Sequence, residues 1–162
     1  MISSRKMEYY INNPFSLIID LRTYNSYVKS HVKNAVNIPY NDMLNVIENI
    51  RTQKFNYDRN NGYRRDIDYV NNKESNSAKN FKAQNDKLVG YLEYFNDKRK
   101  IYVFYCDRGA LSLIICNRMA QTGYITKSVV GGFEQYIRVS GNTAKNIYWC
   151  SRPIKDKMTV IL

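Results

Sequence analysis

The sequence predicts an α/β fold, in which helices cover both faces of a mostly parallel central sheet. Short apolar runs of strand length alternate along the chain with segments whose apolar residues recur at helical spacing. The 162 residues, 44% of them apolar, are enough for one domain with a sizeable core. We expect that domain over residues 1–162, with an inserted polar arm at about 52–84 and a C-terminal extension at about 140–162.

The chain opens with a helix that leads into a strand. Met7, Tyr10 and Ile11 recur at helical spacing, and Ser3 or Ser4 precedes them as a candidate cap. A short apolar run, SLIIDLR, begins at residue 16, soon after a turn-forming Asn-Asn-Pro. This pattern predicts a buried strand that is entered from a turn.

A second strand and an amphipathic helix come next. The run AVNIP at residues 35–39 predicts a short strand that its proline ends. Beyond it, four apolar residues are spaced so that they share one face of a helix: Met43, Leu44, Ile47 and Ile50.

The stretch from about Thr52 to Gln84 has a different composition. Asn, Lys, Asp and Arg dominate it, and its apolar residues are single and mostly aromatic. This predicts an inserted arm or a partly ordered loop, with a candidate role in gripping a partner protein. The helical pattern returns over residues 88–95, and Asp86 is its candidate cap.

The most apolar strand follows and leads to a cysteine. Residues 101–105, IYVFY, predict a strand that ends at Cys106. After a short polar turn, apolar residues at helical spacing predict a helix that Gly123 closes. A last strand at about 127–130, a Gly-Gly turn and a short helix at 133–139 complete the alternation.

The turn after Cys106 is the strongest candidate for a functional site. In an open parallel sheet, ligands bind beyond the carboxyl ends of the strands, and Cys106 lies at such an end. Because the turn leads directly into a helix, its backbone N–H groups and the positive helix end favour a thiolate over a thiol. These features predict a nucleophilic cysteine; the alternative is a small buried residue that only ends a strand.

The residues after Cys106 have candidate substrate-binding roles. Gly109 suits a close backbone approach or a positive φ. Arg108 can pair with an anionic substrate, and Ser112 can donate its hydroxyl to the thiolate or to the loop. The complete candidate loop is Cys106, Asp107, Arg108, Gly109, Ala110, Leu111 and Ser112.

Four motifs in this order resemble the rhodanese-like family. The family's leucine-isoleucine-aspartate-valine-arginine strand corresponds to residues 17–22, LIIDLR. Its second motif combines a tyrosine, a glycine-histidine-isoleucine turn and an alanine-x-asparagine-isoleucine-proline strand. These correspond to Tyr27, to residues 30–32, SHV, and to residues 35–39.

The other two motifs lie in the second half of the chain. The family's active loop has glycine three residues and serine six residues after its cysteine, which corresponds to Cys106, Gly109 and Ser112. Its closing pattern of glycine-tyrosine, valine and glycine-glycine-aromatic corresponds to residues 123–133. The resemblance therefore extends over nearly the whole chain.

This resemblance implies a rhodanese-like fold and a sulfurtransferase that uses neither a metal nor an organic cofactor. The Cys106 thiolate would take a sulfane sulfur from a small anionic donor such as thiosulfate, from a polysulfide or from a protein persulfide. It would hold the sulfur as a persulfide and pass it to a thiol or to cyanide. The loop N–H groups would stabilise the anionic sulfur, as an oxyanion hole stabilises oxygen.

Two loop positions depart from the family pattern. Many members have a basic residue directly after the cysteine, and arginine or threonine five residues after it, where this chain has Asp107 and Leu111. Asp107 opposes an anionic donor and Arg108 only partly offsets it, so thiosulfate specificity does not follow from the resemblance. Ser112 stands where the related phosphatase loop has its phosphate-binding arginine, which argues against phosphatase activity.

Five further residues have weaker indications. Asp20 and Arg22 end the first long strand, and they are either supporting residues of the loop or a structural charge pair. His31 takes the family's histidine position, where we expect a hydrogen bond that fixes a loop rather than catalysis. Cys116 is expected in the core, and Cys150 is a candidate resolving thiol.

Composition narrows the remaining classes of function. Three cysteines and one histidine match neither a disulfide framework nor a four-ligand metal site. No apolar run is long enough to span a bilayer, and the first residues form no signal core. We therefore expect a cytoplasmic protein without a membrane partner. Of the net charge of +11, most lies in residues 99–162, with ten basic and three acidic groups, which favours a small anion over nucleic acid as the partner.

A non-catalytic interaction or regulatory module of the same fold is the alternative function. The length of the polar arm and the unusual residues of the loop, Asp107 and Leu111, support it.

Overall fold

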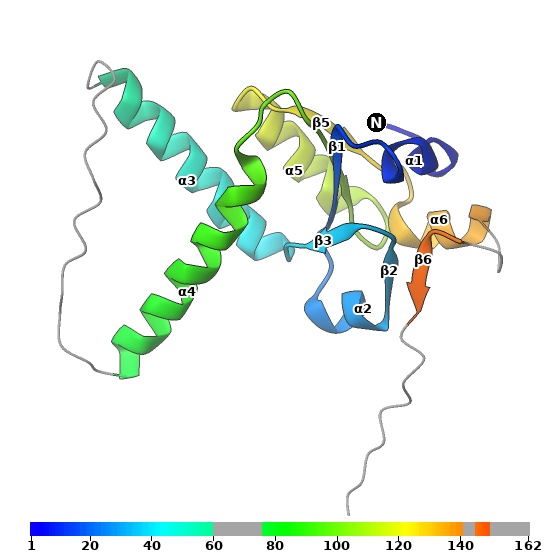
Figure 1. Cartoon of the computed structure of the whole chain (residues 1–162), viewed down its shortest axis with the longest axis horizontal. Helices are drawn as coiled ribbons and strands as arrows, with labels where there is room; N and C mark the ends of the chain where they lie inside the picture. The colour runs from blue at the N-terminus through cyan, green and yellow to red at the C-terminus, as the bar shows by residue number, and fades with distance from the viewer. Residues whose placement is uncertain (60–75, 141–144, 150–162) are drawn as a thin grey trace, which may run out of the picture.

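The computed structural model describes residues 1–59, 76–140 and 145–149, and the side chains of these residues outside 53–82. Its centre is a four-stranded parallel sheet with the strand order β3-β1-β4-β5 (Figure 1). Helices cover both of its faces, so the predicted α/β fold is confirmed. The strands are β1 (Ser16–Asp20), β3 (Ala35–Asn37), β4 (Ile101–Tyr105) and β5 (Ile125–Ser128).

The register of the sheet explains why its two middle strands carry consecutive apolar residues, LII in β1 and IYVFY in β4. β1 lies between β3 and β4, so that Ile18 has Ala35 on one side and Val103 on the other. Successive side chains of a strand point to opposite faces, and accordingly Ile18 and Ile19 belong to different core clusters. Because helices cover both faces, both require apolar residues.

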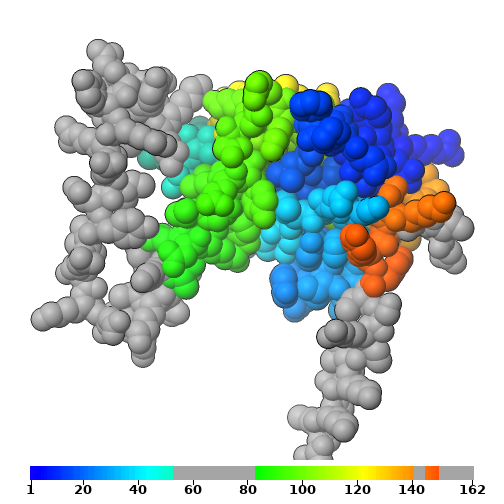
Figure 2. All heavy atoms as spheres, viewed as in Figure 1, coloured from blue at the N-terminus to red at the C-terminus, as the bar shows by residue number. Residues whose placement is uncertain are grey.

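The longer helices cover one face of the sheet. α3 (Tyr40–Arg59), α4 (Asn76–Leu92) and α5 (Ala110–Gln121) pack there, and a short 3-10 helix, η1 (Glu93–Phe95), follows α4. α3 and α4 extend outward beyond the sheet, as Figures 1 and 2 show. The fully buried residues of this face include Ile19, Ile38, Met43, Val46, Phe104, Ile115 and Met119.

The opposite face carries α1 (Ser4–Ile11) and α6 (Gly132–Ser140). Beside them, α2 (Tyr24–Lys29) leads into β2 (Ser30–Val32), which pairs antiparallel with β6 (Ile147–Trp149) in a separate two-stranded sheet. The buried residues of this face include Met7, Ile11, Ile18, Val32, Val103, Tyr105 and Phe133.

The stretch from Thr52 to Gln84, predicted as an inserted arm or a partly ordered loop, contains helix at both of its ends. α3 continues through Arg59 and α4 begins at Asn76, while residues 60–75 lie outside the described part of the chain. Asp86 therefore lies inside α4 and does not cap it. An α-helix satisfies its own backbone hydrogen bonds, so these helices continue past the packed region without an apolar face.

Three short elements were not predicted, and one strand is displaced. α2, β2 and β6 are too short to produce a periodic pattern, and β6 lies in the C-terminal extension. β5 begins at Ile125, directly after the turn at Gly123, and ends earlier than the predicted strand at 127–130. Among the helices of the described residues, none combines the length and the apolar character that crossing a membrane requires.

Buried tyrosines should make the fold sensitive to alkaline pH. Burial raises the pKa of Tyr102 to about 12 and that of Tyr105 well above its ordinary value. The folded chain thus keeps protons that the unfolded chain releases near pH 10, so stability is fully present below that pH and falls as the pH rises toward 12. We expect the free energy of unfolding to fall by about 1.4 kcal/mol per pH unit for each such group.

Denaturant unfolding between about pH 9 and pH 11.5 measures this slope. The variant Tyr102→Phe should have a shallower slope, whatever its stability at neutral pH. Equal slopes for the two proteins would contradict the assignment of the alkaline loss to Tyr102.

Candidate functional site

The loop between β4 and α5 places a cysteine sulfur against a backbone N–H group. Cys106 directly follows β4, and the N–H of Gly109 donates to its Sγ at 3.1 Å. Gly109 has a φ of +95°, and a Cβ there would lie 3.0 Å from backbone atoms of Val129 and Gly131. The loop therefore needs glycine at this position, as the sequence predicted.

A turn from the neighbouring strand holds the outer side of this loop. The N–H groups of Phe133 and Glu134, in the first turn of α6, donate to the carbonyls of Cys106 and Asp107 at 2.8 and 3.0 Å. Gly132 precedes them with a φ of +57°, and a Cβ there would lie 2.2 Å from the Cys106 carbonyl oxygen. Two adjacent strands thus present their loops to each other, and backbone hydrogen bonds join the loops.

Two buried serines lie beneath the sulfur. Ser112 Oγ donates to the carbonyl of Gly109 at 3.0 Å, lies 2.9 Å from Ser128 Oγ and accepts from Cys106 Sγ at 3.8 Å. A hydroxyl has one proton, and that of Ser112 is directed at Gly109, so Ser128 is the donor to Ser112. If Cys106 ionises, a rotation of the Ser112 hydroxyl can direct its proton to the sulfur.

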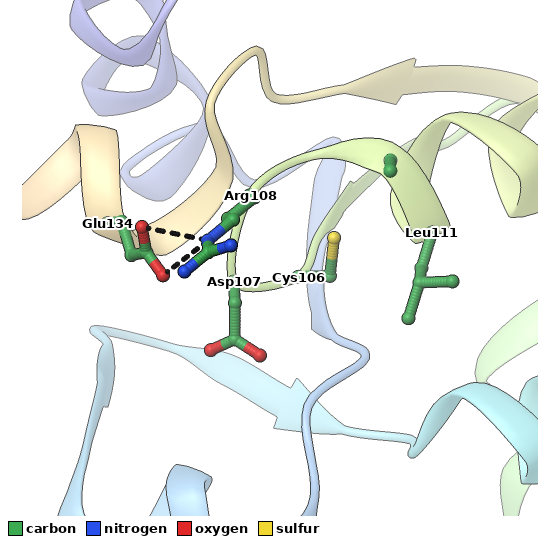
Figure 3. A pocket seen from close by; sticks show the side chains of 6 residues that line it. Cys106, Asp107, Arg108, Leu111 and Glu134 are labelled. Atoms are coloured by element: carbon green, nitrogen blue, oxygen red, sulfur yellow. Dashed lines mark hydrogen bonds and ion pairs between the residues drawn. The ribbon is translucent and has the colours of Figure 1, made fainter.

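A cavity of about 330 Å³ opens above the loop. Figure 3 shows Asp107, Arg108 and Leu111 around it, with Glu134 of α6 at its edge. Cys106 borders the cavity although only 4% of its surface is exposed, whereas Leu111 is 41% exposed. The residues that line it are Cys106, Asp107, Arg108, Ala110, Leu111 and Glu134.

The arginine of the loop is engaged by an acidic residue that the sequence did not indicate. Arg108 Nε donates to both carboxylate oxygens of Glu134, at 3.1 and 3.3 Å. The side chains are 82% and 50% exposed, so the pair lies at the mouth of the cavity in contact with solvent. Arg108 was predicted to pair with an anionic substrate, and in this structure Glu134 takes that place.

A second ion pair lies fully buried next to the loop. Arg22 Nη2 lies 2.7 Å from Asp20 Oδ2 and also donates to the Ser30 carbonyl at 2.7 Å. Its guanidinium lies over the ring of Phe133, 3.7 Å from the ring centroid, and Tyr105 donates its hydroxyl to Asp20 at 2.6 Å. The structure thus places Asp20 and Arg22 behind the loop rather than among the residues that line the cavity.

Burial and charge set the proton affinity of this cluster. Burial acts to lower the pKa of Arg22, but the hydrogen bonds and the charge of Asp20 outweigh it, and that pKa is raised. Burial, followed by the charge of Asp20, raises the pKa of Tyr105 well above its ordinary value. Arg22 is therefore cationic and Tyr105 neutral at neutral pH.

The other candidate residues lie away from the cavity. His31 contacts the Tyr27 carbonyl through Nδ1 at 2.9 Å and stacks on the Tyr27 ring, so its contacts join β2 to α2. Cys116 is buried against Thr126, as expected for a core residue. Cys150 lies outside the described residues.

Sequence reasoning missed two residues of the site, Ser128 and Glu134. Both follow from the topology, because β5 is the neighbour of β4 and its carboxyl end meets the same edge of the sheet. The Gly131-Gly132 pair was a visible signal for a turn there. Within the described residues, no group of three His, Cys, Asp or Glu side chains is placed to hold a metal ion.

Comparisons with known proteins identify relatives of this fold. A model of the rhodanese-like domain family matches residues 5–138. Among curated protein sequences, none matches this chain significantly. A rhodanese-like domain protein from Staphylococcus aureus is similar in structure, with a TM-score of 0.51 and 16% identity over 93% of this chain and 97% of that one.

A second solved structure gives the same result. The rhodanese-like domain of a protein from Anabaena sp. has a TM-score of 0.53 and 12% identity, and the match covers 95% of this chain and 83% of that one. At such low identity, these likenesses show the fold alone.

The buried Asp20–Arg22 pair gives a stability prediction. Asp20→Asn leaves the buried guanidinium of Arg22 without its counter-ion and should cost about 3–5 kcal/mol of unfolding free energy. Tyr105→Phe removes one hydroxyl and keeps the ion pair, so it should cost about 1–3 kcal/mol. Denaturant unfolding compares the two; a smaller loss for Asp20→Asn than for Tyr105→Phe would show that the pair is not the dominant contact.

The Gly131-Gly132 turn gives a second stability prediction. Gly132→Ala forces a left-handed φ on alanine and places its Cβ against two carbonyl oxygens of the loop, so we expect a loss of at least about 2 kcal/mol. Gly90→Ala is the matched control, because a Cβ there meets nothing within 4 Å and alanine favours the helix. Equal stability of the two variants would contradict this account of the turn.

Proposed function

The chain belongs to the rhodanese-like domain family, and from this membership we propose that it is a sulfurtransferase that carries sulfur as a persulfide on Cys106. One observation carries the proposal. Cys106 Sγ lies beside the cavity, at the N-terminus of α5, and the Gly109 N–H already donates to it. An N–H group and a helix N-terminus both favour negative charge on that sulfur.

The proposed reaction has two steps. The Cys106 thiolate attacks the outer sulfane sulfur of a donor; the S–S bond of the donor breaks, and its leaving group departs with the electron pair. An acceptor thiolate or cyanide then attacks the outer sulfur of the Cys106 persulfide and releases the Cys106 thiolate. Thiosulfate, a polysulfide or a protein persulfide could serve as donor, and neither a metal nor an organic cofactor is required.

The surroundings of Cys106 can stabilise both forms of the sulfur. The Gly109 N–H is positioned for the thiolate, and the first-turn N–H groups of α5 lack partners within the helix. These groups can bind the outer sulfur of a persulfide that extends into the cavity. Ser112 supplies a further donor when its hydroxyl turns from the Gly109 carbonyl.

A non-catalytic interaction module is the second candidate function. α3 and α4 extend beyond the sheet and border a second cavity of about 570 Å³, lined mostly by polar side chains such as Asn45, Glu48 and Gln84. Such a surface could bind a partner protein with no chemistry at Cys106.

Mass spectrometry of the intact protein separates the two functions. After exposure to a sulfane sulfur donor, the native chain should gain the mass of one sulfur atom, located on Cys106, and lose it to an added thiol. Cys106→Ser should gain none, because a hydroxyl is a far weaker nucleophile than a thiolate.

Cys116→Ala and Cys150→Ser are the controls for the other two cysteines, and both should load as the native chain does. Sulfur uptake by Cys106→Ser would contradict the proposal. A native chain that takes up no sulfur from thiosulfate, polysulfide or persulfide would favour the interaction module.

A further inference from the structure

The charges at the mouth of the cavity are unusual for a site that receives an anion. Three charged residues line it, Asp107, Arg108 and Glu134. Arg108 is the one cation among these lining residues, and both oxygens of the Glu134 carboxylate accept from its Nε. With this cation neutralised, the lining carries a net charge of −1.

The remaining carboxylate is not balanced by a close cation. Among the described residues, no ion pair includes Asp107. The nearby Arg22 is buried and paired with Asp20, so its charge is already compensated. An anion that approaches Cys106 therefore meets repulsion from Asp107, and it must compete with Glu134 for the guanidinium of Arg108.

Resting on the proposed function, we propose that Asp107 and Glu134 select the sulfur donor by charge: the site takes sulfur from a persulfide whose carrier thiol is neutral or cationic, and it disfavours anionic donors such as thiosulfate. Glu134 acts twice, through its own charge and by holding Arg108. Asp107 acts directly at the cavity. Both are specificity residues, since neither reacts with sulfur.

The loading step balances with such a donor. The Cys106 thiolate attacks the terminal sulfur of a hydropersulfide, R–S–S–H, and a new S–S bond forms on Cys106. The donor S–S bond breaks, and its electron pair leaves with the carrier as the thiolate R–S⁻. The products are the Cys106 hydropersulfide and the carrier thiolate, with one negative charge on each side of the reaction.

A series of small donors of similar size tests the proposal. The persulfides of cysteamine, 2-mercaptoethanol and 3-mercaptopropionate differ mainly in the charge of one end group, which is positive, neutral and negative. Stopped-flow loading of the native chain, followed by mass spectrometry, should give rates in that order. From the size of exposed charge interactions, we expect the cationic donor to load about tenfold faster than the anionic one at low salt.

Two variants assign the effect to the acidic residues. Glu134→Gln should narrow the tenfold ratio, and Asp107→Asn/Glu134→Gln should reduce it to about twofold, with a gain in thiosulfate loading. About 1 M salt should also reduce the differences between the loading rates of the three donors in the native chain, because it screens exposed charges. Glu93→Gln is the control: it removes the same charge from an exposed position on η1, before β4, and should keep the native ratio.

The outcomes separate this inference from the proposed function. If Cys106 loads from all donors at rates independent of their charge, the selection by charge is wrong and the sulfurtransferase stands. If the double variant keeps the native ratio, the assignment of that selection to Asp107 and Glu134 is wrong, and the sulfurtransferase again stands. If no donor loads Cys106 in any variant, the proposed function itself fails. Faster loading from thiosulfate than from the cationic persulfide in the native chain would also overturn the inference.

Discussion

The buried ion pair between Asp20 and Arg22 is the contact on which the site depends. It joins β1 to the hydroxyl of Tyr105 on β4, to the backbone of β2 and to the ring of Phe133 on α6. Tyr105 directly precedes the cysteine of the loop, and Phe133 directly follows the turn that holds the loop. A charge pair that is costly to leave unpartnered thus connects β4, which directly precedes Cys106, with α6, whose first turn holds the loop.

Backbone hydrogen bonds hold the loop that carries the sulfur. The Gly109 N–H binds the sulfur, and the N–H groups of Phe133 and Glu134 bind the loop carbonyls. Such contacts do not depend on side-chain identity, apart from the glycines that permit them. The loop can therefore carry Asp107 and Leu111 without losing its shape, and the fold is recognisable in relatives with which only 12–16% of residues are identical.

The parts of the site that lie close together in sequence were predictable, and the parts that depend on tertiary contacts were not. IYVFY at 101–105, followed by Cys106 and Gly109, indicated a strand, a tight loop and a helix, and the structure has all three. Arg108 looked free for a substrate because its partner, Glu134, comes from the next strand's turn. The helical ends of α3 and α4 were missed because helices that project from the sheet need no apolar stripe.

The position of Cys106 at the inner end of a small cavity restricts the shape of any protein that would exchange sulfur with it. Only 4% of the residue is exposed, and the route to it passes through a cavity of about 330 Å³. If the partner's thiol lay in the middle of a strand or helix, the partner's side chains on either side of it would collide with the rim of the cavity and keep the thiol away from Cys106. A partner must therefore present its sulfur on a narrow projection, such as a loop tip or a chain terminus, that enters side chain first.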